Sequence, residues 1–238
     1  MEQPLNNGYT PQQTQAWFDA RMAKFTSSEI WKLMGVKSLT PDAPLSETAK
    51  TWVIKKFKEL TTGYADEIKA SALEWGKTTE PLAKQELVNR HQVRMRESEF
   101  IQHPTMFYFG GSPDGSMDIN GLKHTVEIKC PYDTAEHYKN ILLSTDAATM
   151  RKEYPELYWQ MQSNMYLQDT KIAIFVTYDH RIKVNPENIY FEAYLERNDA
   201  DIALMLMQLE KAWKYYQEIG FSFNVDVAEY LTPKATAA

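Results

Sequence analysis

The chain has 238 residues, of which 43% are hydrophobic and 24% charged, which is enough apolar material for one sizeable core. Its single cysteine, Cys130, excludes an intramolecular disulfide and any four-cysteine zinc or iron-sulfur site. The net charge of -6 argues against indiscriminate coating of nucleic acid, although it leaves room for a local basic groove.

No run of apolar residues is long enough to span a bilayer, and the first ten residues have neither the basic start nor the apolar stretch of a signal peptide. We therefore expect a cytoplasmic protein without membrane contact. No internal repeat or low-complexity linker divides the chain, so we expect a single domain over residues 1–238. It should comprise a helical N-terminal part (1–65), a core that carries the chemistry (66–223) and a tail (224–238).

The first 35 residues contain two signals for the start of a helix. Thr10 followed by Pro11 predicts a helix to about Ala20. Thr26 and Glu29 then have the spacing of a capping box, which predicts a helix that ends near Gly35. A good helix start explains this pattern by itself.

The same segment also has the composition of an anion site, because hydroxyl side chains at a helix N-terminus lie close in sequence to an arginine. The arginine is Arg21, and Ser28 is the last of the hydroxyl residues.

Two further helices are expected before residue 90. Residues 46–60 form an amphipathic helix ended by Gly63, whose lysines indicate either a solvated face or a DNA-facing surface. In the next helical region Gly76 and Pro81 predict a break or kink between them, followed by a helix to about Asn89. Glu80 lies four residues before Lys84, and an ordinary helical ion pair would explain that spacing.

Strands are expected at 92–101, 106–111 and 125–129. Between the last two, Ser112-Pro113-Asp114-Gly115 predicts a tight turn with the carboxylate of Asp114 at its apex. Because side chains on a strand alternate between faces, Val126 and Ile128 should face the core, and Glu127 and Lys129 should share the opposite face.

If the strands that flank this turn pair as a hairpin, Asp114 and Glu127 converge at one rim. Two hard oxygen ligands suit magnesium or manganese. Lys129 could then steady a nucleophilic water or the charge that develops on a phosphate. This is the chemistry of metal-assisted phosphodiester hydrolysis, although Asp-Gly hairpins and solvated Glu/Lys alternations are also common on ordinary strands.

In the C-terminal half, Thr134 is expected to cap a helix through Leu143, and a second helix is expected over 155–169. Strands are expected over 171–178 and 188–196. Asn198 or Asp199 should then cap a long helix to about Glu218, ended by Gly220. Gln160 and Gln162 are two residues apart and cannot share one helical face. The order of elements predicts an α/β fold with a mixed central β-sheet flanked by helices.

Five motifs occur in an order that resembles the PD-(D/E)xK nuclease superfamily, and within it the phage lambda type exonucleases and the YqaJ-type viral recombinases. They are Arg21 with Thr26 to Glu29, WGKTTEP at 75–81, SPDG at 112–115 with VEIKCP at 126–131, YWQMQSNMY at 158–166, and YDHR at 178–181. The resemblance spans roughly Trp17 to Phe223 and implies a core similar to that of restriction endonucleases.

The resemblance also implies roles for individual residues. Glu80 would be a third acidic residue of the site, beside Asp114, Glu127 and Lys129. The metal ligands would be Asp114, Glu127, the Ile128 carbonyl oxygen and Glu80, directly or through water; three carboxylates could hold two ions. Arg21 and Ser28 would bind a DNA end phosphate, and Gln160 and Gln162 would position the site or the DNA. The tyrosine that the lambda enzyme carries before its first glutamine falls on Leu157 here.

The function implied by the resemblance is a Mg²⁺-dependent exonuclease, with Mn²⁺ as a substitute, that degrades one strand of linear double-stranded DNA from 5′ to 3′ and leaves 3′ overhangs. A homotrimeric ring and a single-strand-annealing recombinase partner are implied as well. Two alternatives remain: an endonuclease of the same superfamily, and a non-catalytic DNA-end-binding recombination protein. The presence of all four of Glu80, Asp114, Glu127 and Lys129 argues against the second. Cys130 is expected to be only a small buried residue.

Overall fold

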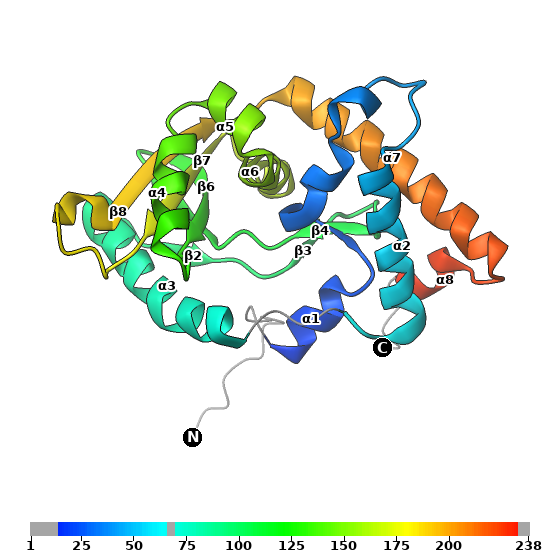
Figure 1. Cartoon of the computed structure of the whole chain (residues 1–238), viewed down its shortest axis with the longest axis horizontal. Helices are drawn as coiled ribbons and strands as arrows, with labels where there is room; N and C mark the ends of the chain where they lie inside the picture. The colour runs from blue at the N-terminus through cyan, green and yellow to red at the C-terminus, as the bar shows by residue number, and fades with distance from the viewer. Residues whose placement is uncertain (1–13, 66–69, 233–238) are drawn as a thin grey trace.

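The structure is a computed structural model that describes residues 14–65 and 70–232. A mixed five-stranded sheet has the order β2-β5-β6-β7-β8, and a small three-stranded sheet has the order β1-β4-β3 (Figure 1). The strands are β1 (Phe25–Thr26), β2 (Arg96–Glu97), β3 (Ile101–Gln102), β4 (Phe109–Gly111), β5 (Gly115–Ile119), β6 (Leu122–Lys129), β7 (Ile172–Tyr178) and β8 (Tyr190–Glu196). The expected mixed sheet flanked by helices is confirmed.

The helical segments are α1 (Gln15–Arg21), η1 (Ser27–Leu33), η2 (Val36–Ser38), α2 (Glu47–Thr62), α3 (Ala70–His91), α4 (Thr134–Leu143), α5 (Ala147–Glu153), α6 (Pro155–Gln168), η3 (Pro186–Ile189), α7 (Asp199–Ser222) and α8 (Val227–Leu231). No helix in residues 14–65 and 70–232 is long and apolar enough to cross a membrane.

Strand β6 lies in the middle of the main sheet, parallel to β7 and antiparallel to β5. Asn120 and Gly121, both with positive φ (53° and 78°), connect β5 to β6, and this conformation matches the twist of a two-residue hairpin. The expected hairpin around residues 112–115 is therefore wrong in one respect. The antiparallel partner of β6 is β5, which begins directly after Asp114, whereas β4 pairs with β1 and β3 in the small sheet.

The two faces of the main sheet pack against different helices. Val126 and Ile128 pack with Ile174 and Val176 against Ala83 and Leu87 of α3, as the alternation of β6 predicts. The opposite face carries Glu127 and Phe175, which are paired in the parallel register, and helix α6 covers it.

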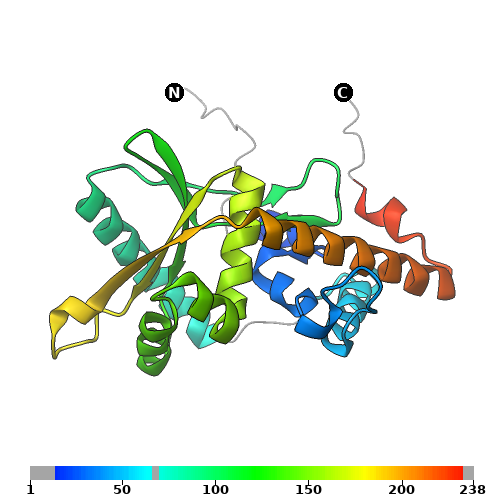
Figure 2. The same ribbon diagram turned by 90° about the horizontal axis from the view of Figure 1, so that it is seen from above.

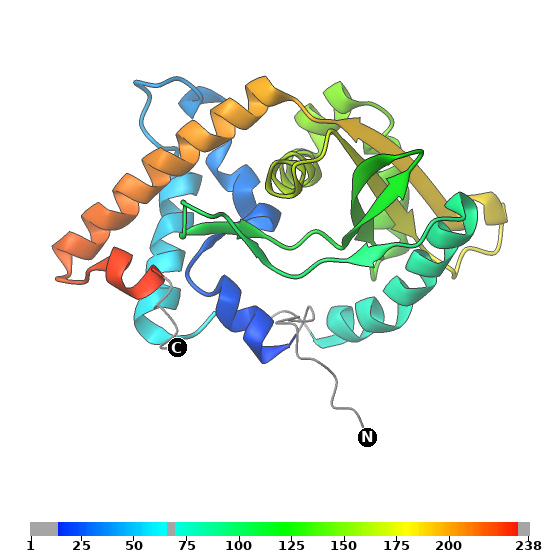
Figure 3. The same ribbon diagram turned by 180° about the vertical axis from the view of Figure 1, so that it is seen from behind.

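Helix α6 is almost entirely buried because it lies between the main sheet and a layer made of η1, α2 and α7 (Figure 2). Met161 and Met165 of α6 join Phe25, Phe109 and Tyr216 in the larger core. The segment of β3 and β4 reaches past α6 toward α2 and α7 (Figure 3), where Tyr108 stacks on Trp213 with the ring centroids 4.4 Å apart. Because α6 is packed on both sides, its polar side chains meet β6 in a fixed position.

Most helix limits agree with the expectations. Ser46 caps α2 by accepting the Ala49 N–H, and Gly63 ends it with φ 66°. Asn198 caps α7. The expected end of this helix at Gly220 is wrong, because α7 continues to Ser222; Gly220 instead leaves room for the Val225 carbonyl, which a Cβ at this position would meet.

Several local expectations are wrong. Helix α3 is continuous from Ala70 to His91, so Gly76 and Pro81 do not break it; a proline costs one helical hydrogen bond, and the packing of the helix on the sheet offsets that loss. The strand expected over 92–101 is reduced to β2 and to the first residue of β3.

The helix starts also differ in part. Residues 27–33 form a 3₁₀ helix in which the Thr26 side chain caps no N–H, so there is no capping box. Asp133 rather than Thr134 caps α4. Thr10 and Pro11 lie outside the described residues, and α1 begins after a different cap, Thr14.

Candidate active site

The backbone of β6 holds Asp114 in place. The Asp114 N–H donates to the Val126 carbonyl (3.1 Å), and the Asp114 carboxylate accepts the Ile128 N–H (2.6 Å). The N–H and C=O of one strand residue point to the same neighbouring strand. The Ile128 carbonyl therefore points to the same edge of β6 as the Ile128 N–H, where Asp114 lies just before the start of β5.

The second carboxylate, Glu127, is only 2% exposed and accepts three side-chain donors. Lys129 donates its Nζ to Oε1 (2.7 Å), Gln160 donates its Nε2 to the same oxygen, and Asn164 donates its Nδ2 to Oε2 (3.1 Å). Lys129 also donates to Gln160 Oε1 (3.2 Å). We call these four residues the Glu127 quartet. Three donors on its two oxygens hold this buried carboxylate in one orientation.

The electrostatics of the two carboxylates and the lysine are coupled. Burial raises the pKa of Asp114 well above its usual range, and the negative charges of Glu127 and Glu80 raise it further. Burial would lower the pKa of Lys129, but the charges of Glu127 and Asp114 outweigh that effect and raise the pKa. Lys129 therefore stays protonated, and Asp114 lies where a further positive charge would be stabilising.

The oxygen atoms of Asp114, Glu127 and the Ile128 carbonyl are hard donors of the kind that magnesium prefers, so these residues fit a divalent cation. The fit is incomplete: within the described residues, no three acidic, histidine or cysteine side chains gather closely enough to hold a metal ion. Glu80 is the expected third carboxylate, and its Oε1 pairs with Lys84 (2.8 Å). Glu80 acts on the site through its negative charge, which raises the pKa of Asp114, rather than through a direct contact.

Arg21 and Ser28 meet beside this site. Arg21 donates to Ser28 Oγ (3.3 Å) and to Ser112 Oγ (3.0 Å), and Trp17 donates to the same Ser112 oxygen (3.0 Å). The guanidinium lies 4.2 Å from the centroid of the Trp17 ring. Since Ser112 lies two residues before Asp114 in the segment that joins β4 to β5, this cluster is fixed next to the carboxylates.

A pocket of about 340 Å³, which we call the Arg21 pocket, is lined by Arg21, Ser28 and Glu29 among others. Burial lowers the pKa of Arg21 to about 10, and the negative charges of Glu29 and Glu127 oppose this. The side chain remains a cation at neutral pH, so the pocket can bind an anionic group.

The two glutamines of α6 have different surroundings. Gln160 belongs to the quartet, whereas the structure does not bring Gln162 to it: Gln162 donates to the Glu196 carbonyl (2.9 Å) and accepts the Asn198 N–H (2.9 Å). Residues two apart project from opposite sides of a helix, as expected. Leu157 is 1% exposed and belongs to the core.

Three residues complete the site although the sequence did not predict this role for them: Asn164, Ser112 and Trp17. A signal existed for Asn164, which lies four residues after Gln160 and therefore on the same helical face. No local signal exists for Ser112 and Trp17, because they meet Arg21 through contacts between segments 91 and 95 residues apart in sequence.

Arg181 fixes the loop that follows Lys129. It pairs with Asp179 (2.7 Å) and donates to the carbonyls of Tyr132 (2.9 Å) and Pro131 (3.3 Å). Its guanidinium lies 4.0 Å from the Trp75 ring centroid. The motif YDHR thus holds the end of β6 and does not form an exposed turn alone.

Cys130 is half-buried, and burial raises the pKa of its thiol to about 12, with help from the charges of Glu80 and Asp114. The group is a protonated thiol at neutral pH and lacks the thiolate character of a nucleophile.

Residues 16–171 match the family of the YqaJ-like viral recombinase domain. Among solved structures, the fold is similar to an alkaline exonuclease, LHK-Exo, from Laribacter hongkongensis (TM-score 0.72, 27% identity, 89% of this chain and 96% of that chain). The complex of LHK-Exo with dAMP is also similar (TM-score 0.70, 27% identity, 89% and 98%).

A phage related exonuclease from Haemophilus somnus 129PT shares the fold at 17% identity (TM-score 0.67, 84% of this chain and 96% of that chain). A comparison with curated proteins finds no match. The family match covers well over half of the sequence, and the chain therefore belongs to the family of YqaJ-like viral recombinase domains.

Proposed function

We propose that this protein is a nuclease that acts in DNA recombination, and more specifically a Mg²⁺-dependent exonuclease that degrades one strand of linear duplex DNA from 5′ to 3′. The observation that carries the proposal is the Glu127 quartet beside Asp114, because a buried glutamate fixed by a lysine is suited to phosphodiester hydrolysis. The family match and the likeness to LHK-Exo support the reaction class.

Asp114, Glu127 and the Ile128 carbonyl would hold a divalent cation, and Glu80 would contribute through water or to a second ion. When bound, Mg²⁺, or Mn²⁺ in its place, supplies Lewis-acid stabilisation of the charge on the reacting phosphate.

The side chains of the protein provide the other parts of the mechanism. Gln160 and Asn164 hold the Glu127 carboxylate, so that it does not have to reorganise during the reaction. The protonated Nζ of Lys129 orients the attacking water and stabilises negative charge. In the Arg21 pocket, Arg21 and Ser28 bind the phosphate at the end of the degraded strand, next to Asp114.

The finer features are proposals as well. Strand polarity, 3′ overhangs as product and processive action rest on the resemblance of the motifs, and so do a homotrimeric ring and a single-strand-annealing recombinase as partner. A ring would place three copies of the Arg21 pocket around one duplex, which helps a protein of net charge -6 to bind DNA. A monomeric state by light scattering would contradict the ring.

The experiment is digestion of an end-labelled linear duplex, with and without Mg²⁺, beside the same DNA as a closed circle. Loss of the linear form from its 5′ ends, dependent on Mg²⁺ and with the circle intact, is the expected result. Cutting of the circle would identify an endonuclease instead. Asp114→Ala should abolish cleavage and preserve binding; binding without cleavage by the unmodified protein would identify a non-catalytic DNA-end-binding protein.

A further inference from the structure

The proposed site indicates where a bound strand would leave it. Arg21 is tied through Ser112 to the segment before Asp114, whereas Lys129 is the last residue of β6. A strand whose end phosphate lies in the Arg21 pocket and whose next phosphate lies at Asp114 would therefore continue past the end of β6. Tyr132 lies three residues beyond Lys129, and three residues of chain span at most about 11 Å. Tyr132 thus borders the path of the strand.

The ring of Tyr132 is open to solvent. The residue is 57% exposed. Its ring meets the ring of Trp75 at an angle of 85°, with the centroids 6.3 Å apart. A perpendicular contact covers at most one face of a ring, so the other face of Tyr132 is available to a flat ligand.

The loop that carries Tyr132 is held by residues from two distant segments. Arg181 donates to the Tyr132 carbonyl (2.9 Å) and pairs with the fully buried Asp179 (2.7 Å). The Arg181 guanidinium lies 4.0 Å from the centroid of the Trp75 ring, and His180 stacks on the same ring with the centroids 5.2 Å apart. Because this loop is already ordered and a tyrosine side chain has few rotatable bonds, a contact to the Tyr132 ring costs little conformational entropy on binding.

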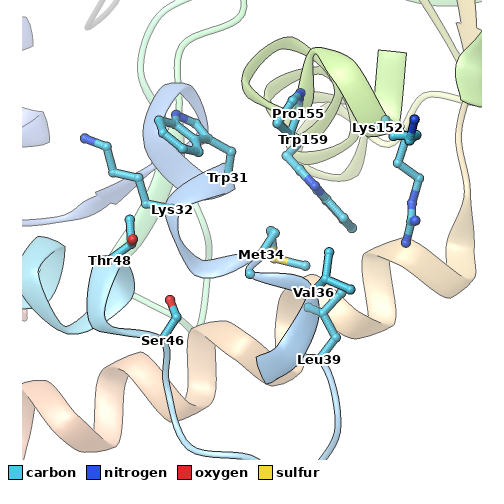
Figure 4. Close-up of a pocket in the computed structure, with 12 residues that line it drawn as sticks. Trp31, Lys32, Met34, Val36, Leu39, Ser46, Thr48, Lys152, Pro155 and Trp159 are labelled. Carbon is cyan, nitrogen blue, oxygen red and sulfur yellow. The ribbon is translucent and has the colours of Figure 1, made fainter. Parts of the chain in front are cut away.

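A cavity with more aromatic residues does not offer such a face. It measures about 500 Å³ and lies between η1 and the start of α6, with Trp31 and Lys32 on one side and Trp159 on the other (Figure 4). Trp159 is only 3% exposed, and Lys32 pairs with Glu29. The exposure of its ring, together with its position beside Lys129, therefore distinguishes Tyr132.

We propose that Tyr132 stacks on an unpaired base of the bound strand, on the 3′ side of the reacting phosphate. The faces of bases in a duplex are covered by their neighbours, so the base at Tyr132 must be unpaired. Every base has such a face, and the contact therefore tolerates any sequence. The direction of the strand rests on the proposed function, whereas stacking of a base on Tyr132 can be measured without cleavage.

The test measures binding of two fluorescent, 5′-phosphorylated single strands to the full chain by anisotropy, in EDTA so that no metal-dependent cleavage occurs. One strand is an ordinary oligodeoxynucleotide. The other has the same length and consists of abasic sites, which keep the phosphates and lack the bases.

Three variants are compared with the unmodified protein. Tyr132→Leu removes the ring and keeps an apolar side chain, whereas Tyr132→Phe keeps the ring and removes the hydroxyl. The matched control is Tyr230→Leu, which removes a tyrosine that is 68% exposed on α8, far from α3 and α4 (Figure 1).

Tyr132→Leu should weaken binding of the ordinary strand about fivefold or more and leave binding of the abasic strand unchanged. Tyr132→Phe and Tyr230→Leu should bind both strands as the unmodified protein does. Because stacking releases no counterions, the slope of log K against log salt should be the same for Tyr132→Leu and the unmodified protein.

Equal affinity of Tyr132→Leu and the unmodified protein for the ordinary strand would overturn the proposal. So would an equal loss with the abasic strand, which would identify a contact to sugar or phosphate, or an equal loss in Tyr132→Phe, which would identify a hydrogen bond of the hydroxyl. If the linear duplex is not digested but Tyr132→Leu loses affinity for the ordinary strand alone, the nuclease proposal fails and the stacking proposal stands. If digestion occurs as expected without that loss, only the stacking proposal fails.

Discussion

Replacement of Asn164 by leucine tests whether the Glu127 quartet is the working part of the site. Asn164 is fully buried and donates to Glu127 Oε2, for which no other donor is recorded among the described residues. Leucine has nearly the same volume and cannot donate. Loss of one hydrogen bond to a charged, buried group should lower the free energy of unfolding by about 1.5–3 kcal/mol.

The effect on catalysis should be separable from the effect on stability. Loss of a partner that orients a metal ligand typically weakens metal affinity or activity by about 10- to 100-fold. We therefore expect the Mg²⁺ concentration for half-maximal digestion of linear duplex to rise by about that factor in Asn164→Leu. Unfolding in urea, followed in parallel, gives the stability change.

Gln162→Met is the matched control. Gln162 is also buried in α6, two residues away, and makes two hydrogen bonds to backbone groups. Its replacement should lower stability by about 1–3 kcal/mol, at about 0.5–1.5 kcal/mol per hydrogen bond, and leave the Mg²⁺ requirement unchanged. If both variants shift the Mg²⁺ requirement equally, or if Asn164→Leu does not shift it, then the quartet does not position a metal ligand.

Four other outcomes are expected. Burial would raise the pKa of Asp179, but hydrogen bonds from Arg181 outweigh this and lower the pKa from 3.8 to about 2. The contribution of Asp179 to stability is therefore complete above pH 3.8 and is lost as the pH falls through 2. Asp179→Asn should remove that part of the pH dependence of urea unfolding. Gly111→Ala would drive a Cβ into the buried hydroxyl of Ser27 and should lower the free energy of unfolding by about 1–3 kcal/mol. Gly76→Ala, with open space around it inside α3, should raise the free energy of unfolding by about 0.4–1 kcal/mol, measured by thermal unfolding. Arg21→Ala should abolish any preference for 5′-phosphorylated over 5′-hydroxyl duplex ends in the digestion assay, and an unchanged preference would show that the Arg21 pocket does not bind the end phosphate.

Several features could be predicted from sequence because they depend on neighbouring residues. Ser46 and Gly63 delimit α2, and the apolar run of β7 indicates a buried central strand. The alternation of β6 was enough to place Val126 in the core and Glu127 on the opposite face. Each signal extends over a few residues, and local backbone preference and burial agree there.

Other features could not be predicted because local signals disagreed with packing. Pro81 is a helix breaker by local preference, but Ala83 and Leu87 on the same helix bury against the sheet, and the helix continues. Thr26 and Glu29 have capping-box spacing, yet Glu29 pairs with Lys32 and Lys56 instead. For these residues, long-range contacts decided the conformation.

The sequence by itself determined which residue types stand at the site: an aspartate after Pro113, a glutamate and a lysine on one face of β6, and a glutamine followed four residues later by an asparagine on α6. Only the tertiary structure decided how they meet. The pairing of β5 with β6 brings Asp114 to Ile128, and the burial of α6 against β6 brings Gln160 to Glu127. The physical reason is that these contacts join segments 14 and 33 residues apart, and their geometry is set by the register of the sheet and the packing of a whole helix.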